Sequence, residues 1–127
     1  MLFKTLLLAG LVTTAGATST PVEAPIVSKP FAGVKANTGK VMAEKVNGRI
    51  VLTLTSDFQN PDAPDPHWQV IDSKGNVYLL HKLSLKDGKM NRSITLPAYI
   101  QDVAKVRMWC AFVEVNLGEA EFETAVK

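Results

Sequence analysis

The stretch GKVMAEKVNGRIVLTLTS, residues 39–56, carries the clearest structural signal in the chain. Asn47-Gly48 stands between two runs of alternating apolar and polar character, and this dipeptide favours the positive φ angles of a two-residue type I′ turn. Successive side chains of a strand point to opposite sides of a sheet, so the second run presents one apolar face. The stretch therefore predicts an antiparallel hairpin that is buried on one side. The residues of that apolar face are Ile50, Leu52 and Leu54.

Turn and breaker residues continue to recur downstream of this hairpin. The prolines of NPDAPDP (residues 60–66) exclude a helix and predict an irregular loop that leads into a strand near Trp68. Turns are predicted at DSKGN (72–76) and KDGK (86–89), and the short strand RSITLP is stopped by Pro97. No long segment has helical periodicity. We therefore predict an all-β fold, an antiparallel β-sandwich or barrel of short strands.

The last long segment contains VRMWCAFVEV (residues 106–115) and is predicted to run as one strand from Val106 to about Phe122. Its apolar residues fall on two faces. We predict that one face forms the main core, and that Cys110 lies on the second face. Another element, a ligand or a partner would have to cover that second face, because an exposed apolar patch is a liability. The residues assigned to the main core are Trp109, Ala111, Val113, Val115 and Leu117.

The start of the chain has the order of a secretory signal peptide, which we assign to residues 1–17. Lys4 is followed by an apolar run and then by small residues that end at Ala17. The apolar run is shorter than the about 20 residues that a membrane-spanning helix needs. Cleavage is predicted after Ala17, with the small-residue site ending at Ala24 as the alternative.

The remaining chain divides into two parts. Residues 18–30 are rich in Pro, Thr, Ser and Ala without a period, and we predict that they form a flexible lead. Residues 31–127 are predicted to form one β domain. The signal peptide predicts export, so we expect the protein in the periplasm, the cell envelope or the extracellular space, with no membrane span after cleavage.

Composition and charge narrow the classes of partner. Fourteen Lys and Arg against twelve Asp and Glu give a formal net charge of +2. The basic residues are scattered singly rather than gathered on one face, so we expect no nucleic-acid partner. The single cysteine, Cys110, allows no internal disulfide, and the domain must be held by packing or by a partner.

Cys110 is the candidate redox thiol of the chain. A naked thiol needs access and a pKa lowered by a cation, an imidazolium or a helix N-terminus. The only imidazoles are those of His67 and His81, which we include as speculative cofactor-binding residues. The alternative is that Cys110 is a small buried hydrophobe, which is the common role of a free cysteine.

His67, His81 and Cys110 are also the candidate ligands of a metal or a haem. His67, His81, Cys110 and a Met could ligate copper, but residues 112–122 lack the His and Met that blue-copper proteins place after the cysteine. One cysteine also lacks the paired spacing of structural zinc sites, so we predict no metal site. There is no C-x-x-C-H motif for covalent haem attachment, whereas non-covalent haem bound by Cys110 or a histidine stays open.

The run VRMWCAFVEVNLGEAEF (residues 106–122) resembles the C-terminal signature of the DM-thirteen domain, a small extracytoplasmic module described as an electron-transfer domain. The likeness rests on the apolar-x-apolar-Trp-Cys core followed by Leu117-Gly118 and Ala120. The GKVM strand, the NPDAPDPHW loop and SITLP support it, so that it covers the chain from about residue 31 to residue 122.

The resemblance implies an all-β fold, frequent association with DOMON domains, and a redox role for Cys110 as a naked thiol or as a ligand to a prosthetic group such as haem. Since no DOMON-like or catalytic segment accompanies it in this sequence, we expect a separate redox partner in the envelope, such as a DOMON-type protein. This reading is an exported electron-transfer module rather than a stand-alone catalyst. The alternative is a non-enzymatic extracytoplasmic binding domain that uses its loops, above all NPDAPDPHWQ, and in which Cys110 is a buried structural residue.

Overall fold

The computed structural model describes residues 24–127 apart from residues 84, 87 and 88. The predicted signal peptide, the first part of the lead and the centre of the KDGK turn lie outside the described residues. The strands of the described part are β1 (Ile26–Val27), β2 (Val41–Val46), β3 (Arg49–Leu54), β4 (Pro66–Ile71), β5 (Val77–Lys82), β6 (Leu85–Lys86), β7 (Lys89–Met90), β8 (Ser93–Thr95), β9 (Val103–Cys110) and β10 (Val115–Val126).

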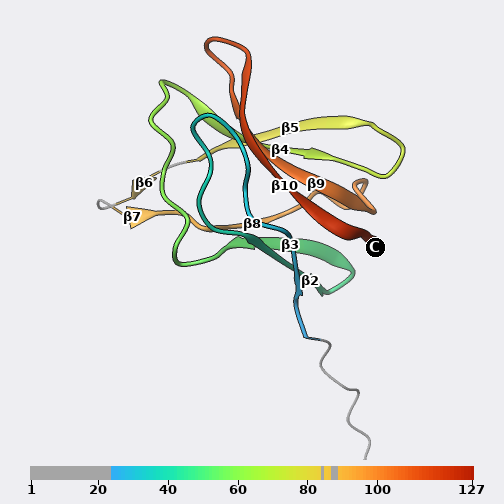
Figure 1. The fold of residues 1–127 in the computed structure, drawn as a ribbon. Coiled ribbons are helices and arrows are strands. Elements are labelled where there is room, and N and C mark those ends of the chain that lie inside the picture. Colours follow the sequence, from blue (N-terminus) through green and yellow to red (C-terminus); the bar gives the residue numbers. More distant parts are fainter. Residues whose placement is uncertain (1–23, 84, 87–88) are drawn as a thin grey trace, which may run out of the picture.

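Two four-stranded antiparallel sheets pack face to face as a β-sandwich (Figure 1). One sheet has the order β1-β2-β3-β8 and the other the order β10-β9-β4-β5, while β6 and β7 form a separate two-stranded ribbon. The all-β prediction is confirmed, and of its two architectures the chain adopts the sandwich. None of the described residues belongs to a helix long and apolar enough to cross a membrane.

The hairpin predicted from residues 39–56 joins β2 to β3. Val46 lies opposite Arg49, so the connecting loop has two residues, and both have positive φ angles, 51° at Asn47 and 78° at Gly48. These are the angles that a type I′ turn requires, and the prediction is confirmed. The predicted apolar face is buried in the core at Ile50, Leu52 and Leu54.

Three further predictions are confirmed: the irregular connection before β4, the DSKGN turn and the end of a strand before Pro97. The NPDAPDP segment forms the irregular connection between β3 and β4, and β8 ends before Pro97. In the DSKGN turn between β4 and β5, the Asp72 N–H donates to the Asn76 carbonyl oxygen (3.0 Å) and the Gly75 N–H donates to the Asp72 carbonyl oxygen (3.1 Å).

The core lies between the two sheets and is rich in aromatic and aliphatic side chains. The rings of Phe31 and Phe58 meet at a tilt of 59° with centroids 5.0 Å apart, a geometry that aromatic pairs favour. Such burial is the main stabilising term for a domain whose one cysteine has no disulfide partner. The largest fully buried side chains are those of Trp68, Phe58, Ile50, Leu52, Leu54, Leu96, Met108, Val41, Val70, Val103, Val106 and Cys110.

The last segment differs from its prediction as one continuous strand. The chain reverses at residues 111–114, where Glu114 has a φ of 57° and its N–H donates to the Cys110 carbonyl oxygen (2.7 Å). The predicted core face was wrong for β9, because the face that carries Cys110 packs into the core and Trp109 is half-buried on the outer face. Apolar residues occupy both faces and continue through the turn, so the sequence pattern hid the reversal. On the inner face of β9, the buried residues are Val103, Val106, Met108 and Cys110.

The start of the domain also lies earlier than predicted. Ile26 and Val27, which fall in the predicted lead of residues 18–30, form β1 and pair with Ala43 and Met42 of β2. Pairing of this kind uses backbone groups, so a composition rich in Pro and Ser does not exclude it.

Residues 28–36 then cross from one sheet to the other and cover the edge of β10. The Lys29 N–H donates to the Glu121 carbonyl oxygen (2.9 Å), and Ala32 and Glu119 exchange two backbone hydrogen bonds (3.0 and 2.9 Å). Covering an edge in this way removes a row of unpaired backbone groups that would otherwise favour aggregation.

Two ends of the sandwich carry the connections. We define the loop end as residues 32–39, 59–65 and 111–114, and the turn end as residues 47–48, 72–76 and 97–102. Strand register places them apart: Cys110 lies opposite Pro66 at the loop end, whereas Ile71 lies opposite Lys105 toward the turn end (Figure 1).

Candidate functional site

Cys110 is the last residue of β9, at the loop end, and it has 0% exposure to solvent. The β9–β10 turn and the loop before β4 meet at this position. The Ala111 N–H donates to the Asp65 carbonyl oxygen (3.0 Å), which ties the β9–β10 turn to the loop before β4. The Cys110 side chain is therefore part of the core, as the structural alternative expected.

Backbone groups set the electrostatics of the sulfur. A hydrogen bond from the Val113 backbone lowers the pKa of the Cys110 thiol; burial raises it, and the backbone of Asp65 and Phe112 adds to the lowering, which prevails. A hydrogen bond to the charged form favours that form. The sequence analysis expected a cation or an imidazole, whereas the groups that lower the pKa of Cys110 belong to the backbone of the β9–β10 turn and of Asp65, which no residue-type pattern could reveal.

His67 does not join Cys110. The two residues lie in adjacent strands of one sheet, but Cys110 is directed into the core and His67 lies on the outer face opposite Trp109. His67 Nδ1 is 3.1 Å from the Asp65 carbonyl oxygen and 3.6 Å from Asp65 Oδ1, so His67 interacts with Asp65 in the loop end rather than with Cys110.

His81 lies elsewhere, exposed on the edge strand β5. It lines a cavity of about 440 Å³ between β5 and β8, together with Trp68, Lys82, Asn91, Ser93, Ile94 and Thr95. The structure therefore does not bring the three candidate cofactor residues together. Within residues 24–127, less the undescribed positions, no three His, Cys, Asp or Glu side chains are placed to hold a metal ion.

The haem implied by the resemblance does not fit at Cys110. A residue that ligates haem needs an apolar cavity beside its donor atom that is wide enough for the flat macrocycle. Cys110 is fully enclosed in the core cluster and does not line the β5–β8 cavity. We derive no chemistry from a haem at this position.

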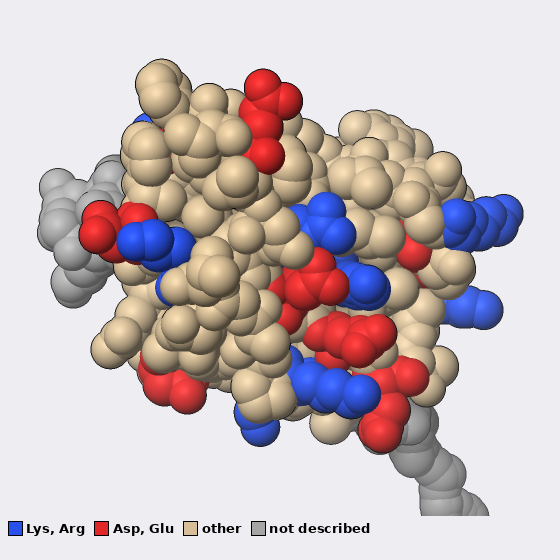
Figure 2. Space-filling view, turned by 45° about the horizontal axis from the view of Figure 1, so that its top comes forward, with Lys and Arg blue, Asp and Glu red and all other residues tan. Residues whose placement is uncertain are grey.

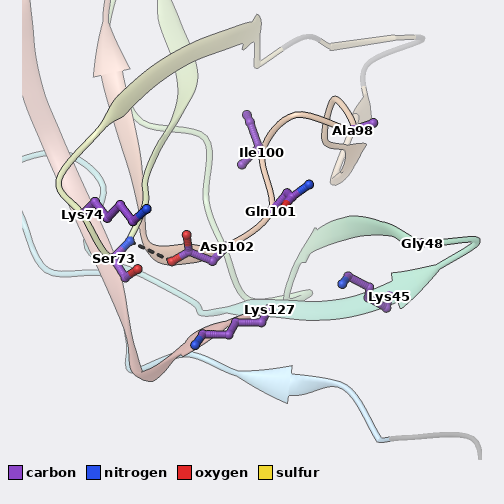
Figure 3. Close-up of a pocket in the computed structure, with 9 residues that line it drawn as sticks. All are labelled: Lys45, Gly48, Ser73, Lys74, Ala98, Ile100, Gln101, Asp102 and Lys127. Atoms are coloured by element: carbon purple, nitrogen blue, oxygen red, sulfur yellow. Dashed lines mark hydrogen bonds between the residues drawn. The ribbon is translucent and has the colours of Figure 1, made fainter.

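A second cavity, of about 540 Å³, lies at the turn end (Figure 3). We call it the lysine pocket, because three of the residues that line it are lysines. They come from β2, from the β4–β5 turn and from the residue that follows β10. The lining residues are Lys45, Gly48, Ser73, Lys74, Ala98, Ile100, Gln101, Asp102 and Lys127.

The outer face of the β10-β9-β4-β5 sheet carries a polar network across three strands. Arg107 donates from Nη1 to Gln69 Oε1 (2.9 Å) and from Nε to Glu119 Oε1 (3.1 Å). Lys105 Nζ donates to Glu119 Oε2 (3.2 Å). On the face drawn in Figure 2, basic and acidic side chains are intermixed rather than separated by sign. Such a face is typical of a solvated surface.

The loop end instead presents an apolar cluster, which we call the apolar tip. Phe112 (75% exposed), Val113 (51%) and Val115 (44%) stand on the β9–β10 hairpin, which projects from the sandwich in Figure 1. Val34 (79% exposed) lies in the loop end as well, and its neighbour Lys35 donates its N–H to the carbonyl oxygen of Leu117 in β10 (3.0 Å). This surface was not predicted from the sequence, because the alternating pattern placed Val113 and Val115 in the core.

Comparison with known proteins adds no relative. No protein-family model, no curated protein and no solved structure matches the chain. The fold defines the class of the protein, an antiparallel β-sandwich.

Proposed function

We propose that this protein is a non-enzymatic binding module of the extracytoplasmic space, and that it contacts a protein partner through the apolar tip. The exposure of Phe112, Val113 and Val115 on one projecting hairpin, together with exposed Val34 in the same loop end, carries the proposal. Contiguous apolar groups at a protein surface mark interaction sites, and Phe is enriched at the centre of interfaces.

The attachment of the tip to the sandwich supports this role. The hairpin is hydrogen-bonded to the loop before β4 through Ala111 and Asp65, and the Leu117 carbonyl oxygen accepts the N–H groups of Lys35 and Ala36. Loops held on a rigid scaffold lose little conformational entropy on binding, and for that reason binding residues are often found on them.

The extracytoplasmic setting rests on the sequence pattern of residues 1–17 and on the DM-thirteen resemblance. A buried Cys110 is compatible with an oxidising compartment, because an enclosed thiol is protected from oxidants. In this proposal, Cys110 packs the base of the hairpin and takes no part in chemistry.

Photo-crosslinking tests the proposal. A benzophenone amino acid is placed at Phe112, or at Val46, which is exposed at the turn end, and the protein is produced in its own host. A discrete adduct that forms from position 112 and not from position 46 is expected. The same adducts from both positions, or none from position 112, would contradict the proposal.

The redox role implied by the resemblance is the second candidate, and one observation favours it. The backbone hydrogen bonds at its sulfur lower the pKa of Cys110, and a lowered pKa raises the thiolate fraction near neutral pH. In thiol–disulfide exchange, the Cys110 thiolate would attack a partner disulfide, form a mixed disulfide and release one partner thiolate. That step requires residues 111–114 to open.

Mass spectrometry distinguishes the two candidates. The folded protein is incubated with oxidised glutathione, and the mixed disulfide at Cys110 is measured before and after unfolding in urea. Formation only after unfolding is expected for the binding module. Formation in the folded state within minutes would favour the redox candidate.

A further inference from the structure

We propose that the lysine pocket is a second ligand site, and that it binds a compact organic polyanion, a molecule with two or more carboxylate, phosphate or sulfate groups on a small carbon skeleton. The pocket lies at the turn end (Figure 3), whereas the apolar tip stands on the β9–β10 hairpin at the loop end (Figure 1), so this inference does not depend on the proposed partner contact.

The charges that line the pocket carry the inference. Lys45, Lys74 and Lys127 enter from three separate elements, and none of them takes part in an ion pair among the described residues. By contrast, Lys82, Lys105 and Arg107 on the sheet that contains β9 each meet a carboxylate within 3.3 Å. The lining therefore contains three lysines against one acidic side chain, that of Asp102, and within the described part of the chain none of the three lysines is held in an ion pair.

The one carboxylate in the lining, Asp102, is already engaged. Its Oδ2 accepts the Ser73 N–H at 2.8 Å, which joins the segment before β9 to the β4–β5 turn (Figure 3). Asp102 therefore fixes the wall of the pocket, and its hydrogen bond orients the turn on which Lys74 stands.

The backbone that carries Lys74 is rigid for a second reason. Asp72 Oδ1 accepts the N–H groups of Lys74 (3.0 Å) and Asn76 (2.8 Å), and Asp72 Oδ2 accepts the Asn76 side-chain amide (2.9 Å). Fixing the backbone in advance reduces the entropy that a ligand must overcome when it binds.

The remaining lining indicates the kind of anion. Ile100 is buried and lies with Ala98 in the wall, so part of the surface suits carbon rather than water. Ser73 and Gln101 supply neutral hydrogen-bonding groups. A volume of about 540 Å³ falls in the range of small-molecule sites. A small organic polyanion matches all three features, whereas a bare halide would use only the charge.

Isothermal titration calorimetry with two probes, citrate and fructose 1,6-bisphosphate, tests the site on the purified protein and separates a carboxylate ligand from a phosphate ligand. The test variant is Lys45→Met with Lys74→Met. The matched control is Lys35→Met with Lys40→Met, which removes the same charge from exposed positions at or near the loop end.

The proposal expects saturable one-to-one binding of at least one probe with a Kd below about 1 mM at low salt, weakened by added salt. The test variant should weaken that binding at least about tenfold and the control less than about twofold. Amide resonances of Ser73 and Gln101 should shift during the titration. Absence of saturable binding, an equal loss in both variants, or shifts confined to other residues would overturn the proposal.

Discussion

Cys110 and Pro66 lie directly opposite each other on β9 and β4, and the residues beyond them are joined by the hydrogen bond from Ala111 to Asp65. The thiol therefore lies beneath two connected segments that begin from a single paired position. Its chemistry depends on whether those segments open, because its strand neighbours on the inner face are buried as well.

Thiol reactivity follows from this enclosure. In the folded protein, Cys110 should react with a chromogenic disulfide reagent at least about 100-fold more slowly than in urea, because reaction must wait for local opening of about 3 kcal/mol or more. A stopped-flow or manual absorbance assay at neutral pH measures both rates. Folded-state rates close to those in urea would show that the loop end opens freely.

Substitutions of Phe112 and Phe58 should differ in their effect on stability, because Phe112 is exposed and Phe58 is buried. Phe112→Asp should change the free energy of unfolding by less than about 0.5 kcal/mol, since the side chain is exposed. Phe58→Ala should lower it by about 3–5 kcal/mol, because Phe58 is buried and packs on Phe31. Urea unfolding followed by tryptophan fluorescence compares them. A large loss in Phe112→Asp would mean that the tip is structural.

Gly118 lies too close to a neighbouring backbone to accept a side chain. A Cβ on Gly118 would collide with the backbone of Ala36, where residues 28–36 cover β10. Gly118→Ala should therefore lower the free energy of unfolding by about 3 kcal/mol or more. Gly48→Ala is the control: its φ is 78° but nothing lies near its Cβ, so a loss of about 1 kcal/mol is expected. Equal losses in the two variants would contradict the contact.

Acid should weaken the outer-face network. Burial raises the pKa of Glu119, but hydrogen bonds from Lys105, Arg107 and Asn116 outweigh it, so that the folded-state pKa lies below its ordinary value of 4.5. A carboxyl whose pKa is lowered on folding stabilises the protein above its unfolded pKa, and this stability is lost as the pH falls through the folded pKa.

Glu119→Gln should accordingly lower the free energy of unfolding by about 1 kcal/mol at pH 7, and the difference from the natural protein should shrink once the pH is well below 4.5. Urea titrations at several pH values check this. Glu121→Gln, whose side chain makes no hydrogen bond or ion pair among the described residues, is the control. A Glu119→Gln deficit that stayed constant with pH would rule out the network as its source.

The sequence predicted those parts of the fold that local chemistry determines. Asn47-Gly48 requires positive φ angles, and the alternation from Ile50 to Leu54 leaves one register with a buried face. The prolines of residues 60–66 likewise allow only an irregular connection. In each of these segments, the residue types leave few alternatives.

The candidate site was harder to predict, because tertiary contacts decide it. Along residues 106–117 the apolar run on the face of Trp109 is unbroken, so the pattern favoured that face as the core, whereas the face of Cys110 is the buried one in β9. The turn at Glu114 lacks Gly, Pro or Asn, so the reversal had no local signal. The amides around Cys110 and the gathering of Lys45 with Lys74 and Lys127 depend on segments far apart in sequence. No spacing pattern within one segment could show them.

We propose that the apolar tip binds a partner while Cys110 packs in the core. The most direct test is photo-crosslinking from position 113 in three backgrounds: the natural protein, Phe112→Asp and Cys110→Ala, with folding of each checked by its unfolding curve. Cys110→Ala should keep the adduct of the natural protein, and Phe112→Asp should lose it. Loss of the adduct in a folded Cys110→Ala protein, with the adduct retained in Phe112→Asp, would contradict binding through the apolar tip and would indicate that the thiol takes part.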